Sequence, residues 1–259
     1  MHAGGVMRTA LGAILAVVVL YGAACAVLFA LQRSLIYFPQ PATARGGASM
    51  MTLPTHDGDV LVTVLPRAGR SALVYFGGNA EDVSASLQEL ERAFPGRSLY
   101  LLHYRGYGGS AGSPSEEALH EDARALFDQV HPTHPDLIAM GRSLGSGVAL
   151  QLAIERPVTR LVLVTPYESL QELAAQQFPL FPVRWLLRDK FESGRFAPHI
   201  RVPTLLIAAE HDEIVPRWST ELLQRRFAPG VATMKVVHGA GHNTISNNPE
   251  YAAALASVR

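Results

Sequence analysis

The chain has 259 residues, and its 22 Lys and Arg are balanced by 22 Asp and Glu, so the formal net charge is zero. Hydrophobic residues make up 48% of the chain and charged residues 17%. This composition excludes a disordered tail and a nucleic-acid-binding protein rich in Lys and Arg. The single cysteine, Cys25, excludes a fold stapled by disulfides within the chain. The length allows one large α/β domain or two small ones.

The first segment is an uncharged apolar run over residues 9–32, flanked by Arg8 and Arg33. As a helix it would be about 36 Å long, enough to cross a hydrocarbon core of about 30 Å. A cleaved signal peptide has a shorter apolar core, of about 7–15 residues. A lipoprotein signal ending at Cys25 is disfavoured because the residues after it stay apolar. We therefore expect residues 1–33 to be an uncleaved single-pass membrane anchor.

The charges at the two ends of this run are nearly balanced, so the positive-inside rule gives little orientation. The N-terminal tail is short, and we expect it to stay cytoplasmic while the rest of the chain is exported. Residues 34–50 combine Pro and Gly with small side chains and are predicted to be a linker. The globular domain is expected over residues 51–259.

Within this domain, apolar runs of strand length alternate with helical patterns and turn residues. Most of the runs lack the alternation of a half-exposed strand, as expected for strands covered on both faces. The predicted strands are residues 61–65, 72–76, 99–103, 137–140, 161–164, 205–209 and 234–237. The predicted helices are residues 82–94, 115–130, 145–154, 217–227 and 250–258.

This alternation predicts an α/β fold with a doubly wound, mostly parallel sheet. Residues 167–202 interrupt it with prolines and aromatic residues, and are predicted to form a cap inserted between two strands. Ligands of such sheets bind at the carboxyl ends of the strands. The residues that directly follow each predicted strand are therefore candidate functional residues.

A nucleophile candidate follows the strand predicted at 137–140. The sequence there is Gly141-Arg142-Ser143-Leu144-Gly145, a G-x-S-x-G pattern. In this pattern the serine lies on a sharp, strained turn that exposes its hydroxyl, and the glycines let strand and helix approach closely. The alternative is a small-residue turn whose serine caps the helix. The position between a buried strand and a helix favours Ser143 as a nucleophile.

A serine hydroxyl needs a base that takes its proton. His242 lies in a glycine-rich loop just after the last predicted strand and is the expected base. Asp212 follows the strand predicted at 205–209 and is expected to orient the imidazole and stabilise the imidazolium. Its neighbours Glu210, His211 and Glu213 are the alternatives, and Asp212 is preferred for its position after the strand. The order Ser, Asp, His is typical of one class of hydrolase sheet.

Other histidines are candidate metal ligands. His238 and His242 have the spacing of a metal pair on a helix, but the glycines between them argue against a helix. No metal site and no organic cofactor are therefore expected. His103 ends a predicted strand and is assigned no role.

Acyl transfer also needs N–H groups aimed at the developing oxyanion. One is expected from Leu144, the residue after the nucleophile. The other is expected from Asn79, in the Gly-rich loop after the strand predicted at 72–76. The alternative for this loop is a tight turn that only opens the next helix.

These features together resemble the α/β-hydrolase superfamily, in particular a small membrane-anchored serine-hydrolase branch related to acyl-protein thioesterases and to serine aminopeptidase-like hydrolases. The resemblance covers the chain from residue 34 to the C-terminus. The motifs that carry it are Tyr37-Phe38-Pro39, Tyr75-Phe76-Gly77-Gly78-Asn79-Ala80, Tyr104-Arg105-Gly106-Tyr107-Gly108-Gly109-Ser110, the Ser143 motif, Thr165-Pro166-Tyr167, Asp212-Glu213-Ile214-Val215-Pro216 and Gly241-His242-Asn243.

The resemblance implies that Ser143 is the nucleophile, Asp212 the acid and His242 the base, with Asn79 and Leu144 as oxyanion donors. One departure is Gly77-Gly78, where many relatives have His-Gly, so any support from that histidine side chain is lost. The loop at 104–110 is expected to be a structural turn under the pocket, in which Arg105 is a candidate partner for an acidic side chain.

The chain is thus predicted to be a membrane-anchored serine hydrolase that cleaves an ester or thioester of a small or lipid-like acyl substrate. A serine peptidase of the same fold is the enzymatic alternative. A non-catalytic scaffold that binds a partner at the membrane is the other, and it would usually lack one member of the triad.

Overall fold

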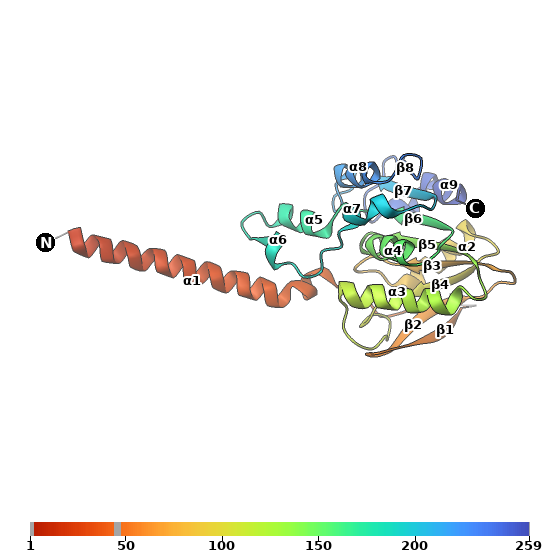
Figure 1. The fold of residues 1–259 in the computed structure, drawn as a ribbon, viewed down its shortest axis with the longest axis horizontal. Helices are drawn as coiled ribbons and strands as arrows, with labels where there is room; N and C mark the ends of the chain where they lie inside the picture. Colours follow the sequence, from red (N-terminus) through yellow and green to blue (C-terminus); the bar gives the residue numbers. More distant parts are fainter. Residues whose placement is uncertain (1–2, 44–47, 259) are drawn as a thin grey trace.

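The computed structural model describes residues 3–43 and 48–258. Residues 1–2 of the predicted anchor, 44–47 of the predicted linker and 259 of the predicted domain lie outside this part. A long helix projects from a domain of alternating strands and helices (Figure 1). The strands are β1 (Ser49–Thr55), β2 (Gly58–Leu65), β3 (Ser71–Phe76), β4 (Ser98–Leu102), β5 (Asp136–Arg142), β6 (Arg160–Val164), β7 (Thr204–Ala209) and β8 (Ala232–Val237).

The helices confirm the predicted pattern, and three short ones lie in the predicted cap. They are α1 (Ala3–Ile36), α2 (Leu87–Ala93), α3 (Glu116–Val130), α4 (Leu144–Glu155), α5 (Leu170–Gln177), α6 (Val183–Leu186), α7 (Ser193–Phe196), α8 (Arg217–Arg226) and α9 (Pro249–Ala256). Short 3₁₀ helices are η1 (Val83–Ser86), η2 (Ala197–His199) and η3 (Ile245–Asn247). The helix predicted at 82–94 is thus divided between η1 and α2.

The strands form a sheet in the order β1-β2-β4-β3-β5-β6-β7-β8. Strand β2 pairs antiparallel with β1 and β4, whereas β4, β3 and β5–β8 run parallel to one another. The mostly parallel, doubly wound sheet is therefore confirmed. The central strands are buried almost throughout, which explains their unbroken apolar sequences.

Strand β1 was not predicted. It is an edge strand in which only Leu53 is buried, and it contains Pro54. A proline is tolerated at a sheet edge because no further strand needs its N–H. With one buried residue and a proline, and next to a segment rich in small residues, the sequence of β1 does not show the apolar pattern from which a strand is predicted.

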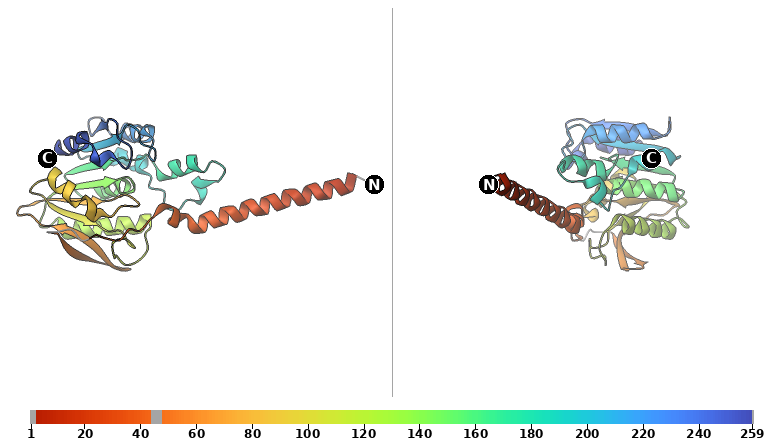
Figure 2. Two further views of the ribbon diagram at one scale, coloured as in Figure 1. Left: turned by 180° about the vertical axis from the view of Figure 1, so that it is seen from behind. Right: turned by 60° about the vertical axis from the view of Figure 1, so that its left-hand side comes forward.

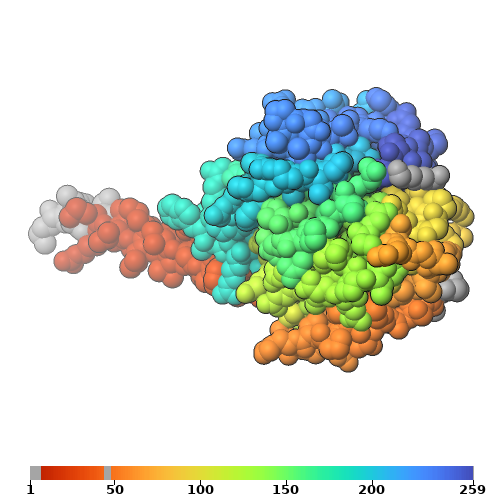
Figure 3. All heavy atoms as spheres, turned by 45° about the vertical axis from the view of Figure 1, so that its right-hand side comes forward, coloured from red at the N-terminus to blue at the C-terminus, as the bar shows by residue number. Residues whose placement is uncertain are grey.

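Two apolar layers cover the sheet. Helices α3, α4 and α8 pack on one face, with Leu126, Val148 and Leu223 in the core there. Helices α2 and α9 pack on the other face through Leu90 and Leu255 (Figure 2). Helices α5 and α6 of the cap lie with the base of α1 at one side of the domain (Figures 1 and 3). The register aligns the carboxyl ends of the parallel strands at one edge, as in the pair of Phe76 with Gly141.

One helix of the described chain is long and apolar enough to cross a membrane, over Met7–Ile36. Its side chains over residues 7–24 are exposed, which fits the uncharged run in the sequence. The helix ends at Ile36, and Tyr37 directly after it is buried in the domain. The division into anchor, linker and domain stays a prediction.

The glycines beside Ser143 make a testable packing prediction. A Cβ on Gly145 would lie 2.1 Å from the carbonyl oxygen of Phe76, whereas a Cβ on Gly78 would have no neighbour nearer than 3.6 Å. We expect Gly145→Ala to lower the free energy of unfolding by about 3 kcal/mol, because backbone must move. Gly78→Ala should lower it by less than about 1 kcal/mol. Thermal unfolding of the full chain in detergent measures both, and similar losses would contradict the packing.

The buried Arg105 makes a second prediction. Its guanidinium donates to Asp122 at 2.9–3.2 Å, and the two side chains are 3% and 0% exposed. Asp122→Asn would leave the buried guanidinium with Asp57 and Glu121 alone, whose side chains are 55% and 46% exposed, so it should cost about 2 kcal/mol of stability. The matched control is Asp128→Asn, which breaks an exposed pair with Arg156 and should cost under about 1 kcal/mol. Equal losses in urea unfolding would refute the distinction.

Candidate active site

Ser143 lies at the tight turn between β5 and α4. Its backbone has φ 49° and ψ −118°, a conformation that is strained for a residue with a side chain. Its N–H donates to the carbonyl of Val164 at 2.8 Å, and its own carbonyl accepts from the N–H and hydroxyl of Ser146 at 2.9 and 2.6 Å. These bonds hold the strained turn. Within the described chain the Ser143 side chain makes no capping bond to α4, so the helix-cap alternative is not what the structure has.

The structure brings the three predicted side chains into one hydrogen-bonded chain. Nε2 of His242 lies 3.0 Å from Oγ of Ser143, and Nδ1 lies 2.9 Å from both carboxylate oxygens of Asp212. Asp212 also accepts the N–H groups of Ile214 and Val215 at 3.0 and 2.7 Å. The carboxylate is thereby fixed in position. An Nδ1–H facing it leaves the Nε2 lone pair directed at the serine hydroxyl.

The alternatives to Asp212 have other positions. Glu210 accepts the N–H of Gly239 at 2.8 Å, and the side chain of His211 is 72% exposed. Glu213 accepts the backbone N–H of His242 at 3.2 Å. Glu213 therefore supports the histidine loop, while Asp212 contacts the imidazole itself.

Arg142 also lies at the site, although the sequence analysis gave it no role. Its Nη2 donates to the carbonyl of His242 at 3.2 Å. Together with Glu213, it holds both backbone polar groups of the histidine. The available signal was its position inside the Gly141–Gly145 motif, directly before Ser143, which places it at the end of the same strand.

His238 and His103 lie away from Ser143. Nδ1 of His238 contacts Glu250 at 3.1 Å, and its side chain is 69% exposed. His103 is buried and contacts the hydroxyl of Thr63 at 2.8 Å. Burial lowers the pKa of His103, which keeps it neutral in the core. It does not line the cavity beside Ser143.

The two predicted oxyanion donors lie next to the serine. Leu144 is the first residue of α4, so its N–H has no acceptor inside the helix. The N–H of Asn79 has no acceptor among the described residues. Both residues line a cavity with Ser143. A Cβ added to Gly78 would lie 3.7 Å from that of Ser143, which shows how closely the loop approaches.

The loop with Gly77-Gly78 is held without a histidine. Glu81 accepts the N–H of Gly78 at 2.8 Å and the hydroxyl of Tyr75 at 2.7 Å. Tyr104 donates its hydroxyl to the carbonyl of Gly77 at 2.8 Å. A carboxylate and a tyrosine thus hold this loop in place.

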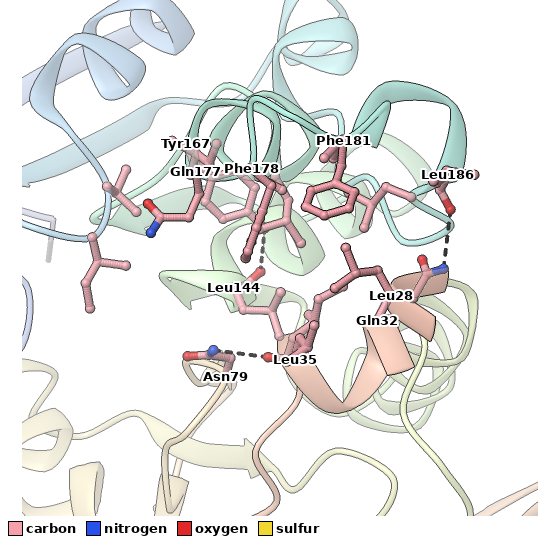
Figure 4. Close-up of a pocket in the computed structure, with 18 of the residues that line it drawn as sticks. Leu28, Gln32, Leu35, Asn79, Leu144, Tyr167, Gln177, Phe178, Phe181 and Leu186 are labelled. Carbon is pink, nitrogen blue, oxygen red and sulfur yellow. Dashed lines mark hydrogen bonds between the residues drawn. The ribbon is translucent and has the colours of Figure 1, made fainter. Parts of the chain in front are cut away.

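Ser143 opens into a cavity of about 480 Å³. One wall is the last part of α1, with Leu28, Gln32 and Leu35, and the opposite wall is the cap (Figure 4). Tyr167 closes the inner end, where its hydroxyl donates to the carbonyl of Leu144 at 3.2 Å. The cap residues of the lining are mainly apolar: Leu170, Leu173, Ala174, Gln177, Phe178, Phe181, Val183, Leu186 and Leu187. That α1 forms a wall of the cavity was not predicted. A local sequence pattern shows that a helix is apolar, but not which part of the protein packs against it.

The comparisons with known proteins agree with this fold. A family model described as serine aminopeptidase, S33 (Hydrolase_4) matches residues 70–196. The uncharacterized protein Rv2307c of Mycobacterium tuberculosis is 38% identical over 231 residues, covering 82% of this chain and 80% of that protein. Lysophosphatidylserine lipase ABHD12 of Mus musculus is 32% identical over 143 residues, which are 47% of this chain and 35% of that protein.

Among solved structures, the esterase Pf2001 of Pyrococcus furiosus aligns with a TM-score of 0.67 at 16% identity. The alignment covers 85% of this chain and 96% of the esterase. This likeness concerns the fold, whereas the relationship to Rv2307c extends over most of both sequences. The chain belongs to the α/β-hydrolase superfamily.

Proposed function

We propose that the protein is a membrane-anchored serine hydrolase that cleaves an ester or thioester of an apolar acyl group. The observation that carries the proposal is the hydrogen-bonded chain Asp212–His242–Ser143, whose serine lines a mainly apolar cavity. The superfamily is one of hydrolases, and one relative is named a lysophosphatidylserine lipase. The long apolar helix α1 supports the anchor. As in the sequence-based prediction, the catalytic domain is proposed to lie on the exported side.

The proposed reaction follows from the positions of the groups. Nε2 of His242 takes the proton of Ser143 as Oγ attacks the acyl carbonyl carbon. The negative oxygen accepts hydrogen bonds from the N–H groups of Asn79 and Leu144. The bond to the leaving group then breaks, and His242 gives its proton to the departing oxygen or sulfur. Water, activated by the same histidine, attacks the acyl-enzyme and releases the acid.

An acyl ester suits the cavity better than a peptide with a free amino terminus. An α-ammonium group needs a carboxylate close to the scissile bond. Among the described residues lining the cavity, Glu213 is the only acidic side chain, and its Oε2 already accepts the N–H of His242. The leucine and phenylalanine side chains around it instead suit a hydrocarbon chain.

A fluorophosphonate probe tests the nucleophile and excludes the non-catalytic scaffold. The wild-type chain should be labelled, because an activated serine attacks the phosphorus. Ser143→Ala should lose the label, while Ser257→Ala, at an exposed serine whose hydroxyl contacts Lys235, should keep it. Labelling is read by gel fluorescence and by mass spectrometry of the modified peptide. Equal labelling of wild type and Ser143→Ala would assign the nucleophile elsewhere.

The base is tested by turnover. His242→Ala should lower kcat for any accepted ester by at least about 10³-fold, since no other group takes the serine proton. His238→Ala is the matched control, because this histidine contacts Glu250 and not Ser143, and its kcat should stay within about twofold. A loss below tenfold in His242→Ala would contradict its role.

The substrate class is tested with a series of p-nitrophenyl esters. Each CH₂ that enters the apolar cavity should add about 0.8 kcal/mol of binding, or about fourfold in kcat/KM, until the cavity is full. Acyl-thioesters and aminoacyl-p-nitroanilides complete the comparison. A preference for the anilides would favour the peptidase over the esterase.

A further inference from the structure

The tip of the cap lies against the middle of α1. We define the cap tip as residues 178–185. The rings of Tyr21 and Phe181 are stacked with centroids 6.0 Å apart and planes 7° from parallel. The hydroxyl of Tyr21 donates to the carbonyl of Leu180 at 2.9 Å. The cap tip is therefore held at the level of Tyr21, far along α1 from the domain.

A second set of contacts joins the base of the cap to the last turns of α1. Gln32 donates from its amide to the carbonyl of Leu186 at 3.3 Å and accepts the N–H of Arg188 at 2.7 Å. The guanidinium of Arg188 lies 4.2 Å above the ring centre of Phe29. With two sets of contacts, the depth of α1 in a membrane also fixes the depth of the cap.

That depth follows from the length of the helix. A hydrocarbon core of about 30 Å takes about 20 helical residues. Counted from Arg8, the first charged side chain of the described helix, such a span ends near Leu28. Tyr21 lies about 10 Å before Leu28 at a rise of about 1.5 Å per residue. The cap tip at the level of Tyr21 is thus on the hydrocarbon side of this boundary.

The composition of the cap tip suits that environment. Residues 178–183 read Phe-Pro-Leu-Phe-Pro-Val and carry no charge. Arg184, the charged residue of the cap tip, is paired with Glu172 through two hydrogen bonds of 2.9 and 2.8 Å. Leu180 and Trp185 are 80% and 88% exposed, so the protein itself does not cover them. Backbone polar groups in hydrocarbon need partners within the protein. The two prolines have no N–H, and the N–H groups of Phe178, Phe181 and Val183 donate to carbonyls of the cap, so among residues 178–183 only the N–H of Leu180 lacks a partner in the described part of the chain.

We propose that the cap tip inserts into the bilayer that α1 crosses, and that the acyl chain of a bilayer lipid enters the Ser143 cavity directly from the hydrocarbon. Phe29 and Phe178 line the cavity and are 36% and 42% exposed, so the cavity reaches the surface between α1 and the cap. The acyl chain of a lipid ester in that leaflet can then enter the Ser143 cavity from the hydrocarbon without first crossing water. This entry route rests on the proposed hydrolase function, whereas insertion of the tip does not.

Insertion is tested by fluorescence quenching of the full chain in phosphatidylcholine vesicles. The chain has two tryptophans, so Trp218→Phe leaves Trp185 as the only one. Vesicles with bromines at carbons 6 and 7 of the acyl chain should quench Trp185 by at least about half. In the matched variant Trp185→Phe, the remaining Trp218 on α8 should be quenched by less than about a tenth. Quenching of Trp185 no stronger than that of Trp218 would overturn the insertion.

The entry route is tested with Leu180→Glu/Trp185→Glu, two exposed positions that do not line the cavity. Hydrolysis of a long-chain ester embedded in vesicles should fall at least tenfold, because a charge in hydrocarbon is unfavourable. Hydrolysis of p-nitrophenyl acetate should stay within twofold. The control Met50→Glu, on the edge strand β1 and 49% exposed in the wild type, should leave both rates unchanged.

The outcomes separate the two proposals. The first outcome is that the double variant hydrolyses the vesicle ester as fast as the wild type, while Ser143→Ala loses both activities. This result would overturn the entry route alone. If the double variant loses both activities equally, Leu180 and Trp185 are needed for folding and not for lipid entry. This result would also overturn the entry route. Retention of both activities in Ser143→Ala would overturn the proposed hydrolase function, while the quenching result would still decide whether the tip inserts.

Discussion

A buried carboxylate, Asp189, holds the end of α1 against the domain. It accepts the guanidinium of Arg33 at 3.0 and 3.3 Å and the hydroxyl of Tyr37 at 3.1 Å. Burial, with the charge of Asp189 alongside, raises the pKa of Tyr37, so the hydroxyl stays a donor at physiological pH. A buried carboxylate is costly without such partners. The bonds therefore give the end of α1 one position, on which the cavity wall and the depth of the cap both depend.

The same helix end is tied to the loop of the proposed oxyanion hole. The side-chain amide of Asn79 donates to the carbonyl of Ile36 at 3.0 Å, one of the last carbonyls of α1 that lack an intrahelical partner. The carbonyl of Asn79 in turn accepts from the N–H of Phe38 at 3.0 Å and from the hydroxyl of Tyr107 at 2.6 Å. Helix α1 is therefore joined to the proposed catalytic groups by hydrogen bonds, in addition to leading into the domain.

The sequence predicted what is encoded locally. Buried parallel strands have continuous apolar runs, and residues that follow their carboxyl ends meet at one edge. Ser143, Asp212 and His242 could therefore be predicted to lie together, and the structure brings them together. Strand β1 could not, because its burial is slight and Pro54 weakens its pattern. The contacts of Gln32 with the cap, more than 150 positions away, were also beyond reach. A polar side chain at the end of an apolar run has many conceivable partners, and only the tertiary fold selects one.

The cap differs from the sheet in how it is stabilised. Neither α5 nor α6 has a buried side chain, so this part of the protein has no core of its own. The apolar side chains of α5 and α6 line the cavity, as Leu173 and Val183 do, or lie exposed, as Trp185 does. Exposed apolar surface of this kind is normally covered by a ligand, a partner or a membrane. In the proposed arrangement an acyl chain covers the inner side and hydrocarbon covers the outer side. Bond cleavage would then depend on the rigid strand ends, whereas the choice of substrate would depend on a cap whose packing is completed by lipid.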